Sequence, residues 1–285
     1  MLKQRIITAL ILAPIMIGGI FFLPLSEFMI FIGVITALGA WEWAKMAGVP
    51  STYGRLAYAA VISGVIFSVE WFDRTQEAEL LYVAAVWWIL ALLLIITHPK
   101  YETLWQSIPI RLVLGFAVLV PMWVGFVQIK SYPYSSYLIL FVMLIIWGAD
   151  VGAYFAGRTF GKHKLAPKVS PGKTWEGVVG GLLTTGLIAW AGGEFLQAQT
   201  TDAVMQTNII LGSSDWALIF FATFIVTVVS VVGDLFESLM KRHCGLKDSS
   251  NLLPGHGGVM DRIDSMTAAL PIFALALSLY GGSLF

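Results

Sequence analysis

Runs of about 20 apolar residues, the length that crosses roughly 30 Å of hydrocarbon as a helix, recur along the whole chain. Each run therefore predicts one membrane-spanning helix. The nine predicted spans are 5–24, 27–47, 56–72, 79–97, 110–130, 137–157, 174–196, 215–233 and 263–283. The third span is the weakest, because Ser63, Gly64, Ser68 and Glu70 dilute its apolar character.

The first run also has features of a secretory signal peptide, since Lys3 and Arg5 precede its apolar stretch. Eight further spans follow it, and no clear small-residue cleavage site ends it. We therefore expect an uncleaved first helix.

The composition supports a membrane protein. Apolar residues make up 58% of the 285 residues, charged residues only 12%, and the mean hydropathy is +0.82, whereas soluble domains carry about 25% charge. These values exclude a soluble globule, a disordered chain and a disulfide-stapled scaffold. Lys+Arg and Asp+Glu are equal at 17 each, so no net charge points to nucleic acid. Cys244 is the only cysteine and has no partner for an internal disulfide. The predicted fold is an all-α polytopic membrane protein.

The basic residues are distributed unequally between the two sides that nine spans would create. Cytoplasmic loops are enriched in Lys and Arg, so the basic side is predicted to be cytoplasmic, together with the N-terminus and loops 158–173 and 234–262. The opposite side receives Arg74 and Lys130 only. The basic side receives Lys3, Arg5, Lys45, Arg55, Lys100, Arg111, Arg158, Lys162, Lys164, Lys168, Lys173, Lys241, Arg242, Lys247 and Arg262.

The chain also divides in character. Residues 1–135 are interpreted as bulk apolar transmembrane helices, and residues 136–285 as a catalytic transmembrane region that holds most of the unexpected polarity. Gly148 and Gly152 form a G-x-x-x-G pattern in the second part, which predicts close helix packing there.

Ionisable residues in or beside membrane helices are costly and are functional candidates by default. Most of them follow residue 140, and they are Asp150, Glu176, Asp234, Glu237, Asp261 and Asp264. In the first half, Glu42 lies between Trp41 and Trp43. For Glu42, snorkelling or a structural hydrogen bond is as plausible as a role in a site.

Two groups of polar residues have helical spacing. Asp261 and Asp264 would share one helix face, and Asp234, Glu237, Ser238 and Lys241 would form one stripe. Carboxylates gathered by two such stripes would repel each other, and Mg²⁺ resolves such repulsion when carboxylates and substrate phosphates hold it together. The alternative is an ordinary solvated helix end.

A glycine-rich loop precedes the pair of aspartates, at Pro254-Gly255-His256-Gly257-Gly258. Glycines let a backbone approach a ligand closely and turn its N–H groups toward an anion. Upstream, Lys241, Arg242 and Lys247 supply charge suited to phosphate. Together these features suggest a metal-bound polyphosphate. His256 has three possible roles: a general base, a hydrogen-bond donor to phosphate, or a residue that only shapes the turn.

The other cytoplasmic loop contains Ser170-Pro171-Gly172-Lys173-Thr174. It is not a P-loop, because Pro167 stands where the first glycine of that motif belongs and no strand is expected before it. Ser170 or Thr174 could cap the following helix, whose N-terminus would favour an anion. A plain basic loop explains the charges equally well.

Residues 238–264 resemble the signature of the CDP-diacylglycerol synthases, also called phosphatidate cytidylyltransferases. The matching stretch is Ser238-Leu239-Met240-Lys241-Arg242, then, after four residues, Lys247-Asp248-Ser249-Ser250-Asn251-Leu252-Leu253-Pro254-Gly255-His256-Gly257-Gly258-Val259-Met260-Asp261-Arg262-Ile263-Asp264. The segment 170–174, the chain length and the many predicted helices are also similar to bacterial members.

This resemblance implies that CTP and phosphatidic acid give CDP-diacylglycerol and pyrophosphate with Mg²⁺, and that K⁺ is a candidate second cation. It implies metal ligation by Asp234, Asp261 and Asp264, which with Lys241 form the expected catalytic set. The expected substrate-binding residues are Ser170, Lys173, Thr174, Ser238, Arg242, Lys247, His256, Gly257, Gly258 and Arg262. A homodimer in a bacterial inner membrane, with its active site facing the cytoplasm, is also expected.

Three other functions share parts of this pattern. A secondary transporter would also have polar residues within its spans, but here the charge concentrates toward one face. A CDP-alcohol phosphotransferase needs D-G-x-x-A-R and a D-x-x-x-D, whereas this chain has D-x-x-D at Asp261 and Asp264. A purely structural membrane scaffold would not need residues 238–264.

Overall fold

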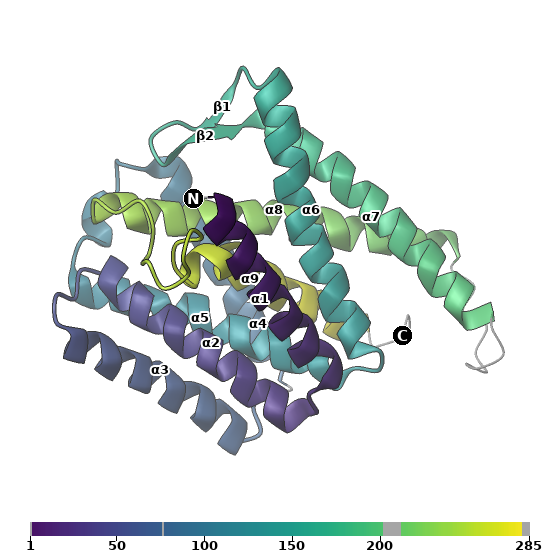
Figure 1. Cartoon of the computed structure of the whole chain (residues 1–285), viewed down its shortest axis with the longest axis horizontal. Helices are drawn as coiled ribbons and strands as arrows, with labels where there is room; N and C mark the ends of the chain where they lie inside the picture. Colours follow the sequence, from purple (N-terminus) through teal and green to yellow (C-terminus); the bar gives the residue numbers. More distant parts are fainter. Residues whose placement is uncertain (1, 76, 202–211, 281–285) are drawn as a thin grey trace.

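The computed structural model describes residues 2–75, 77–201 and 212–280, which contain nine α-helices, one short 3₁₀ helix and one two-stranded sheet (Figure 1). The first helices are α1 (Leu2–Phe22), α2 (Leu25–Met46), α3 (Thr52–Trp71) and α4 (Glu79–Thr97). The 3₁₀ helix (Glu102–Leu104) precedes α5 (Ile108–Ser131) and α6 (Ser135–Phe160). The remaining elements are β1 (Lys164–Ala166), β2 (Ser170–Thr174), α7 (Trp175–Thr201), α8 (Ser213–His243) and α9 (Met260–Leu279).

Each of the nine predicted spans coincides with a helix. Eight of the described helices are long and apolar enough to cross a membrane, and α1 contributes a shorter apolar stretch, Ile6–Phe22. Residues 281–283 of the last predicted span lie outside the described residues. The prediction of a polytopic helical membrane protein is therefore confirmed.

The main departure from the predicted boundaries is at α8, which continues from the predicted end at residue 233 to His243. Counting apolar residues ends a span at the first acids, but the apolar side chains beyond them still recur at helical spacing. Leu235, Phe236, Leu239 and Met240 are all buried, and their burial favours continuation of the helix. The predicted loop 234–262 is therefore wrong in its bounds, because the loop between α8 and α9 spans only residues 244–259.

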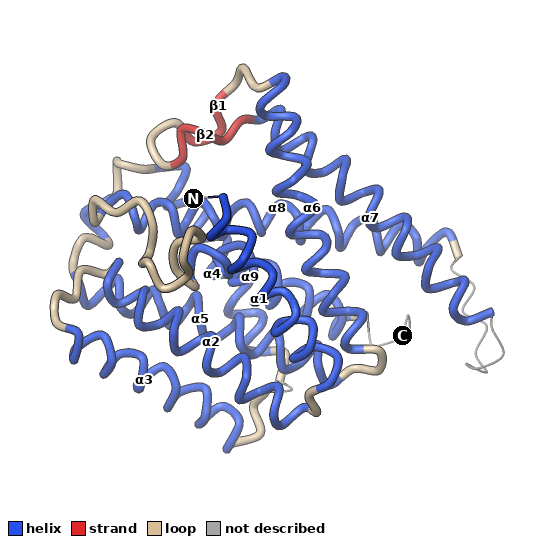
Figure 2. The backbone as a smooth tube through the Cα atoms, viewed as in Figure 1, coloured by secondary structure: helices blue, strands red, loops and turns tan. Residues whose placement is uncertain are grey.

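A second departure is the short antiparallel hairpin between α6 and α7, which Figure 2 shows in red. It lies within the predicted loop 158–173 and pairs Lys164 with Thr174 and Ala166 with Ser170. The all-α prediction did not include this hairpin, because Pro167 and Pro171 are residues that usually mark loops.

The buried centre of the bundle is formed by α5 and α9, whose candidate spans are 72% and 67% buried inside the protein. Gly125 on α5 permits their close packing, since a Cβ atom there would lie 2.8 Å from the backbone nitrogen of Pro271 on α9. The central position of α9 fixes its first turn, which carries Asp261 and Asp264.

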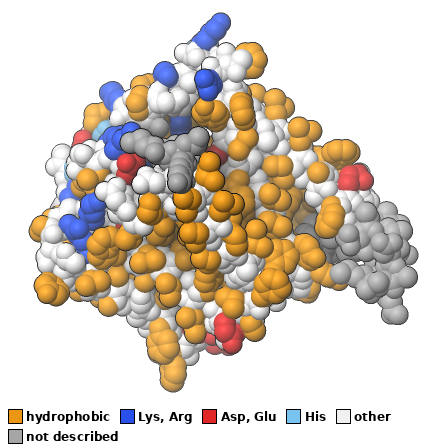
Figure 3. Space-filling model, viewed as in Figure 1, with side chains coloured by type: hydrophobic (Ala, Val, Ile, Leu, Met, Phe, Trp, Pro, Cys, Tyr) orange, Lys and Arg blue, Asp and Glu red, His pale blue; other side chains and the backbone are white. Residues whose placement is uncertain are grey.

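The predicted close packing around Gly152 is also confirmed. A Cβ atom at Gly152 on α6 would lie 2.5 Å from the carbonyl oxygen of Gly180 on α7. In Figure 1, α7 runs along α6 at the outer edge of the molecule. Leu183 and Leu187 on α7 are exposed, and hydrophobic side chains cover much of the face seen in Figure 3. Such a surface suits lipid.

Segments that are predicted to lie on the basic side contact one another. Thr8 Oγ1 on α1 donates a hydrogen bond to the carbonyl oxygen of Pro254 (2.8 Å), and His243 Nδ1 at the end of α8 lies 2.6 Å from Glu102 Oε1. Lys130, from the opposite side, instead contacts the carbonyl oxygen of Ile20. These contacts agree with the prediction that the loops carrying most basic residues lie together at one end of the helix bundle. The side chains of Lys3 and Arg5 lie outside the described part, and which end faces the cytoplasm stays a prediction.

Candidate active site

The C-terminal part of α8 carries the predicted polar stripe. Because α8 is helical through His243, Asp234, Glu237, Ser238 and Lys241 lie along one face. Lys241 Nζ forms an ion pair with Glu237, and both side chains are nearly inaccessible to solvent. Ser238 Oγ donates to Asp234 Oδ1 at 3.3 Å. These four residues thus form two polar pairs along one face of an otherwise apolar helix.

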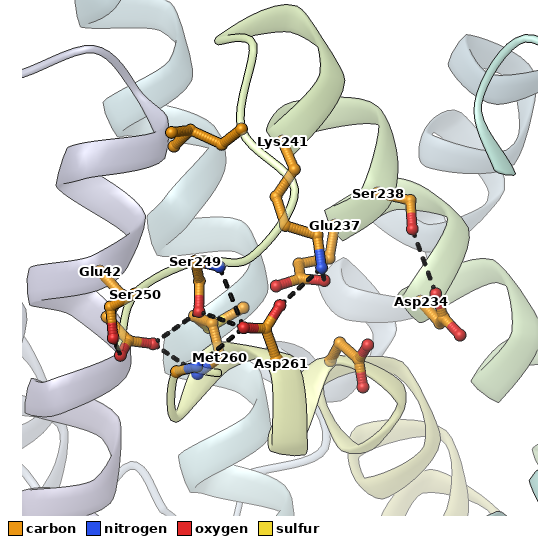
Figure 4. Close-up of polar contacts among 12 residues, drawn as sticks. Glu42, Asp234, Glu237, Ser238, Lys241, Ser249, Ser250, Met260 and Asp261 are labelled. Carbon is orange, nitrogen blue, oxygen red and sulfur yellow. Dashed lines mark hydrogen bonds and ion pairs between the residues drawn. The ribbon is translucent and has the colours of Figure 1, made fainter. Parts of the chain in front are cut away.

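Asp261, in the first turn of α9, faces this stripe. Its Oδ1 lies 2.6 Å from Lys241 Nζ, and its Oδ2 accepts hydrogen bonds from the backbone N–H groups of Ser249 (3.0 Å) and Gly258 (2.8 Å) (Figure 4). Asp261 therefore joins α8, α9 and the loop between them.

Asp264 lies one turn further along α9, where α8 and α9 cross closely. A Cβ atom at Gly233 would be 2.6 Å from the carbonyl oxygen of Asp264. Because Gly233 directly precedes Asp234, this crossing places Asp264 beside the start of the polar stripe on α8. Asp264 Oδ1 accepts a hydrogen bond from the Ser265 N–H (2.7 Å), and no lysine or arginine of the described chain forms an ion pair with it.

Protein cations contact two of the three predicted metal-binding acids. Lys173 Nζ lies 2.7 Å from Asp234 Oδ2, and Lys241 contacts Asp261. Within the described residues, no three His, Cys, Asp or Glu side chains are grouped so that they could hold a metal ion as they stand. Asp234, Asp261 and Asp264 are thus neighbours at one helix crossing but do not form a ready-made metal cage.

The β1–β2 hairpin reaches the same region through Lys173. Thr174, the last residue of β2, is buried and its Oγ1 accepts a hydrogen bond from the Gly177 N–H (3.1 Å). Thr174 therefore caps α7. Of the two capping residues predicted, Ser170 and Thr174, it is Thr174 that takes this role. Ser170 begins β2 and is half-buried. Glu176 holds the start of the hairpin, because its Oε1 lies 2.6 Å from His163 Nδ1.

The end of the glycine-rich loop lies against Asp261, to which the Gly258 N–H donates. Besides the Gly258 contact, a Cβ atom at Gly257 (φ +87°) would lie 2.5 Å from Asp261 Oδ2. His256 lies in a turn in which its N–H donates to the Leu253 carbonyl oxygen (2.8 Å), and its buried Nδ1 has no partner among the described residues. The turn position of His256 is observed, and a role toward a ligand stays a prediction.

Three predicted phosphate-binding cations remain exposed. Arg242, Lys247 and Arg262 form no ion pair with an acid in the described part of the chain. They are therefore available to a charged ligand at the surface above the acids.

A cavity of ≈ 200 Å³ opens beside the acids between α6, α7, α8 and β2. Asp150, Lys173 and Thr174 contribute polar groups to its wall, whereas Tyr154 and Val231 are among its apolar neighbours. Polar groups therefore adjoin an apolar wall that faces neighbouring membrane helices.

Sequence reasoning missed the importance of residues near the N-terminus. Glu42 on α2 is completely buried and accepts four hydrogen bonds, so the snorkelling interpretation is wrong. Lys45 Nζ on the same helix donates to the Ser249 carbonyl oxygen at 2.9 Å. The available signal was a glutamate within an apolar run, but its partners lie about two hundred residues away and have no local pattern.

Comparison with known proteins identifies the family. The model of the Cytidylyltransferase family matches residues 3–280. This chain belongs to the cytidylyltransferase family. Among curated proteins, it is 49% identical to the phosphatidate cytidylyltransferase of Pseudomonas aeruginosa over 97% of both chains. It is 39% identical to the Haemophilus influenzae phosphatidate cytidylyltransferase over 96% of this chain and 98% of the relative. The Staphylococcus epidermidis phosphatidate cytidylyltransferase is 32% identical over 97% of this chain and 99% of the relative.

These matches confirm the resemblance drawn from residues 238–264. They cover nearly the whole chain, including its first half. Membership of the cytidylyltransferase family favours nucleotidyl transfer over the transporter, phosphotransferase and scaffold alternatives.

Proposed function

We propose that this cytidylyltransferase condenses CTP with phosphatidic acid, giving CDP-diacylglycerol and pyrophosphate. In this reaction, a phosphate oxygen of the lipid forms a bond to the α-phosphorus of CTP, and the bond between the α-phosphorus and the bridging oxygen breaks as pyrophosphate leaves in line. The relatives named above support the substrates. The observation that carries the proposal for the site is the meeting of the α8 stripe with Asp261 and Asp264 beside a cavity between membrane helices.

The cations of the site suit two phosphate-bearing substrates. Such transfers depend mainly on positioning and charge stabilisation. Lys173, Arg242, Lys247 and Arg262 orient phosphate groups, while the buried Lys241 holds Glu237 and Asp261 in place. The nucleophile needs no strong general base, because a phosphate monoester already loses its second proton near pH 6.

The cavity offers a location for the phosphatidic acid headgroup. Its polar wall at Lys173 and Thr174 would meet the phosphate, and the acyl chains would remain among apolar helices. Water-soluble CTP would approach from the loops. This arrangement lets an insoluble and a soluble substrate meet without withdrawing the lipid from the bilayer.

The residues present fit Mg²⁺ in chemistry. Asp234, Asp261 and Asp264 supply the hard oxygen ligands that Mg²⁺ prefers, and substrate phosphates complete such sites. Glu237 adds a fourth acid, and in the described chain only two lysines pair with this group: Lys173 with Asp234, and Lys241 with both Glu237 and Asp261. The acids therefore outnumber the protein cations that contact them, which suits a bound cation. Mg²⁺, with K⁺ as a candidate second cation, would neutralise charge on the phosphates and align them.

We place this active site on the cytoplasmic face of a bacterial inner membrane. The concentration of basic residues in the loops around the site supports that orientation. We propose a homodimer from the family resemblance alone. Gly152 gives no further support for a dimer, because it packs α6 against α7 within one chain. Cross-linking in native membranes tests the dimer.

Pyrophosphate release by the purified, reconstituted protein tests the function. We expect release to require CTP, phosphatidic acid and Mg²⁺ together, with diacylglycerol in place of phosphatidic acid as the control lipid. Release that is independent of phosphatidic acid would contradict the proposal. Solute transport without nucleotide would instead favour the transporter.

A further inference from the structure

Glu42 lies at the centre of a polar network that links α2 to the first turn of α9. Its side chain is completely inaccessible to solvent, although it sits within a membrane helix. Burying a carboxylate at such a position is costly unless hydrogen bonds or charges compensate it. The compensation must therefore come from specific neighbours.

Four donors surround the Glu42 carboxylate, two for each oxygen (Figure 4). Oε1 accepts from Ser250 Oγ at 2.5 Å and from the Val259 N–H at 3.0 Å. Oε2 accepts from Ser249 Oγ at 3.0 Å and from the Met260 N–H at 2.6 Å. Each oxygen thus receives one hydroxyl group and one backbone N–H.

Both oxygens of this side chain must accept a hydrogen bond, because each of them faces a backbone N–H. The N–H groups of Val259 and Met260 belong to the start of α9, where the helix dipole favours a negative charge, and no ion pair to Glu42 exists among the described residues. A glutamine would direct its NH₂ group at a backbone N–H, which cannot accept a hydrogen bond. An aspartate keeps the charge but is one methylene shorter.

The same network holds Asp261. Ser249 Oγ lies 3.0 Å from Glu42 Oε2 and 2.9 Å from Asp261 Oδ2, so this serine lies between the two carboxylates. Gly258, whose N–H donates to Asp261, packs directly against Glu42, since a Cβ atom there would lie 2.5 Å from both Glu42 oxygens. Lys45, one turn after Glu42, holds the Ser249 carbonyl oxygen.

We propose that Glu42 is a positioning residue that acts through Asp261. Glu42 holds the start of α9 and Ser249, and thereby fixes the Asp261 carboxylate opposite Lys241. It touches no substrate. The inference rests on the proposed function, because it assumes that Asp261 takes part in the reaction.

The test compares purified full-length Glu42→Gln, Glu42→Asp and wild-type proteins in lipid nanodiscs. For Glu42→Gln, we expect kcat to fall about 100-fold, the loss typical of a misplaced catalytic group, while KM for CTP changes less than about threefold and the protein remains folded at the assay temperature. Glu42→Asp should recover part of kcat. Glu27→Gln is the matched control, because Glu27 is exposed at the opposite end of the same helix, and its kcat should be unchanged.

A folded Glu42→Gln protein with kcat within about threefold of wild type would overturn the inference. So would a loss of kcat that only matches the fraction of unfolded protein. If wild type itself fails to release pyrophosphate from CTP and phosphatidic acid, the proposed function fails instead, which separates the two hypotheses.

Two serine variants keep the test decisive if Glu42→Gln does not fold. Ser249 contacts both carboxylates, whereas Ser250 contacts only Glu42 among the acids. Ser249→Ala should therefore reduce kcat more than Ser250→Ala when both lower the unfolding temperature to a similar extent. Equal effects on kcat would contradict action through Asp261.

Discussion

The ammonium group of Lys241 lies 2.6 Å from Oδ1 of Asp261, and the two side chains are only 10% and 7% exposed. Lys241 also pairs with Glu237, so its removal leaves two buried acids without a cation. Breaking a buried ion pair costs about 3–5 kcal/mol. Lys241→Met is therefore expected to lower the unfolding temperature strongly and to abolish pyrophosphate release.

The double variant Lys241→Met/Asp261→Asn should regain part of the lost thermal stability but no activity, because it removes one of the uncompensated charges. Arg74→Met is the control, since Arg74 and Glu77 form an exposed pair that should contribute no more than about 1 kcal/mol. Equal unfolding temperatures for Lys241→Met and Arg74→Met would show that the buried pair does not stabilise the fold.

Asp264→Asn should lower kcat by at least about 100-fold and raise the Mg²⁺ concentration needed for half-maximal activity, as expected for loss of a charge that supports a metal. The protein should still insert and fold, because the amide can accept the Ser265 hydrogen bond. Asp215→Asn is the control, as Asp215 caps the opposite end of α8. Near-normal activity with unchanged metal dependence would remove Asp264 from the mechanism.

Lys173→Gln should raise KM for CTP or phosphatidic acid about tenfold, which corresponds to the loss of one charge-assisted hydrogen bond. The ion pair of Lys173 with Asp234 holds the hairpin near the acids. Lys168→Gln provides a matched control, because Lys168 is exposed on the same hairpin. Steady-state kinetics with each substrate varied in turn distinguishes the two affinities. Identical KM values for both variants would exclude Lys173 from substrate binding.

Gly258→Ala should lower both thermal stability and kcat, because the added Cβ would collide with the oxygens of Glu42. Gly186→Ala, on α7, is expected to be tolerated, since no heavy atom lies within 4 Å of a Cβ at that position and alanine favours a helix. Fluorescence-detected unfolding and activity assays compare the two. A stable, fully active Gly258→Ala would show that the loop adapts readily.

The thiol of Cys244 should react slowly with maleimide in the folded protein. Burial raises the pKa of this thiol above its ordinary value, and Sγ donates to the carbonyl oxygen of Met46 at 2.6 Å. Because the thiolate is the reactive form, the labelling rate at any given pH should lie below that of free cysteine and should keep rising at more alkaline pH. Labelling in dodecyl sulfate is the control for the exposed thiol. Equal rates in the folded and unfolded protein would contradict a thiol that is half-buried and hydrogen-bonded.

The number and positions of the helices could be predicted from the sequence, because membrane insertion depends on local apolar length. The D-x-x-D spacing at Asp261 and the stripe ending at Lys241 were also readable, since helical period alone places these side chains on one face. The end of α8 was nevertheless misplaced, because a boundary set by apolar length stops at the first acids, whereas the helix continues and its polar face pairs with Asp261.

The partners of individual groups were equally invisible in the sequence. Gly258 was expected to turn its N–H toward a substrate anion, but in the structure that N–H donates to Asp261. Glu42 differed from its apolar surroundings, yet nothing local distinguished a buried acceptor from an isolated acid. Contacts between distant segments decide such cases, and a single sequence does not encode them as a pattern.

Glu42 and Ser249 are 207 positions apart in the chain. During synthesis, the glutamate therefore enters the membrane long before the ribosome has produced any of its four donors. Until α9 follows, the nascent protein carries an acid without its native partners among its early helices, and the cost of keeping that acid in the bilayer falls only when the last helix arrives.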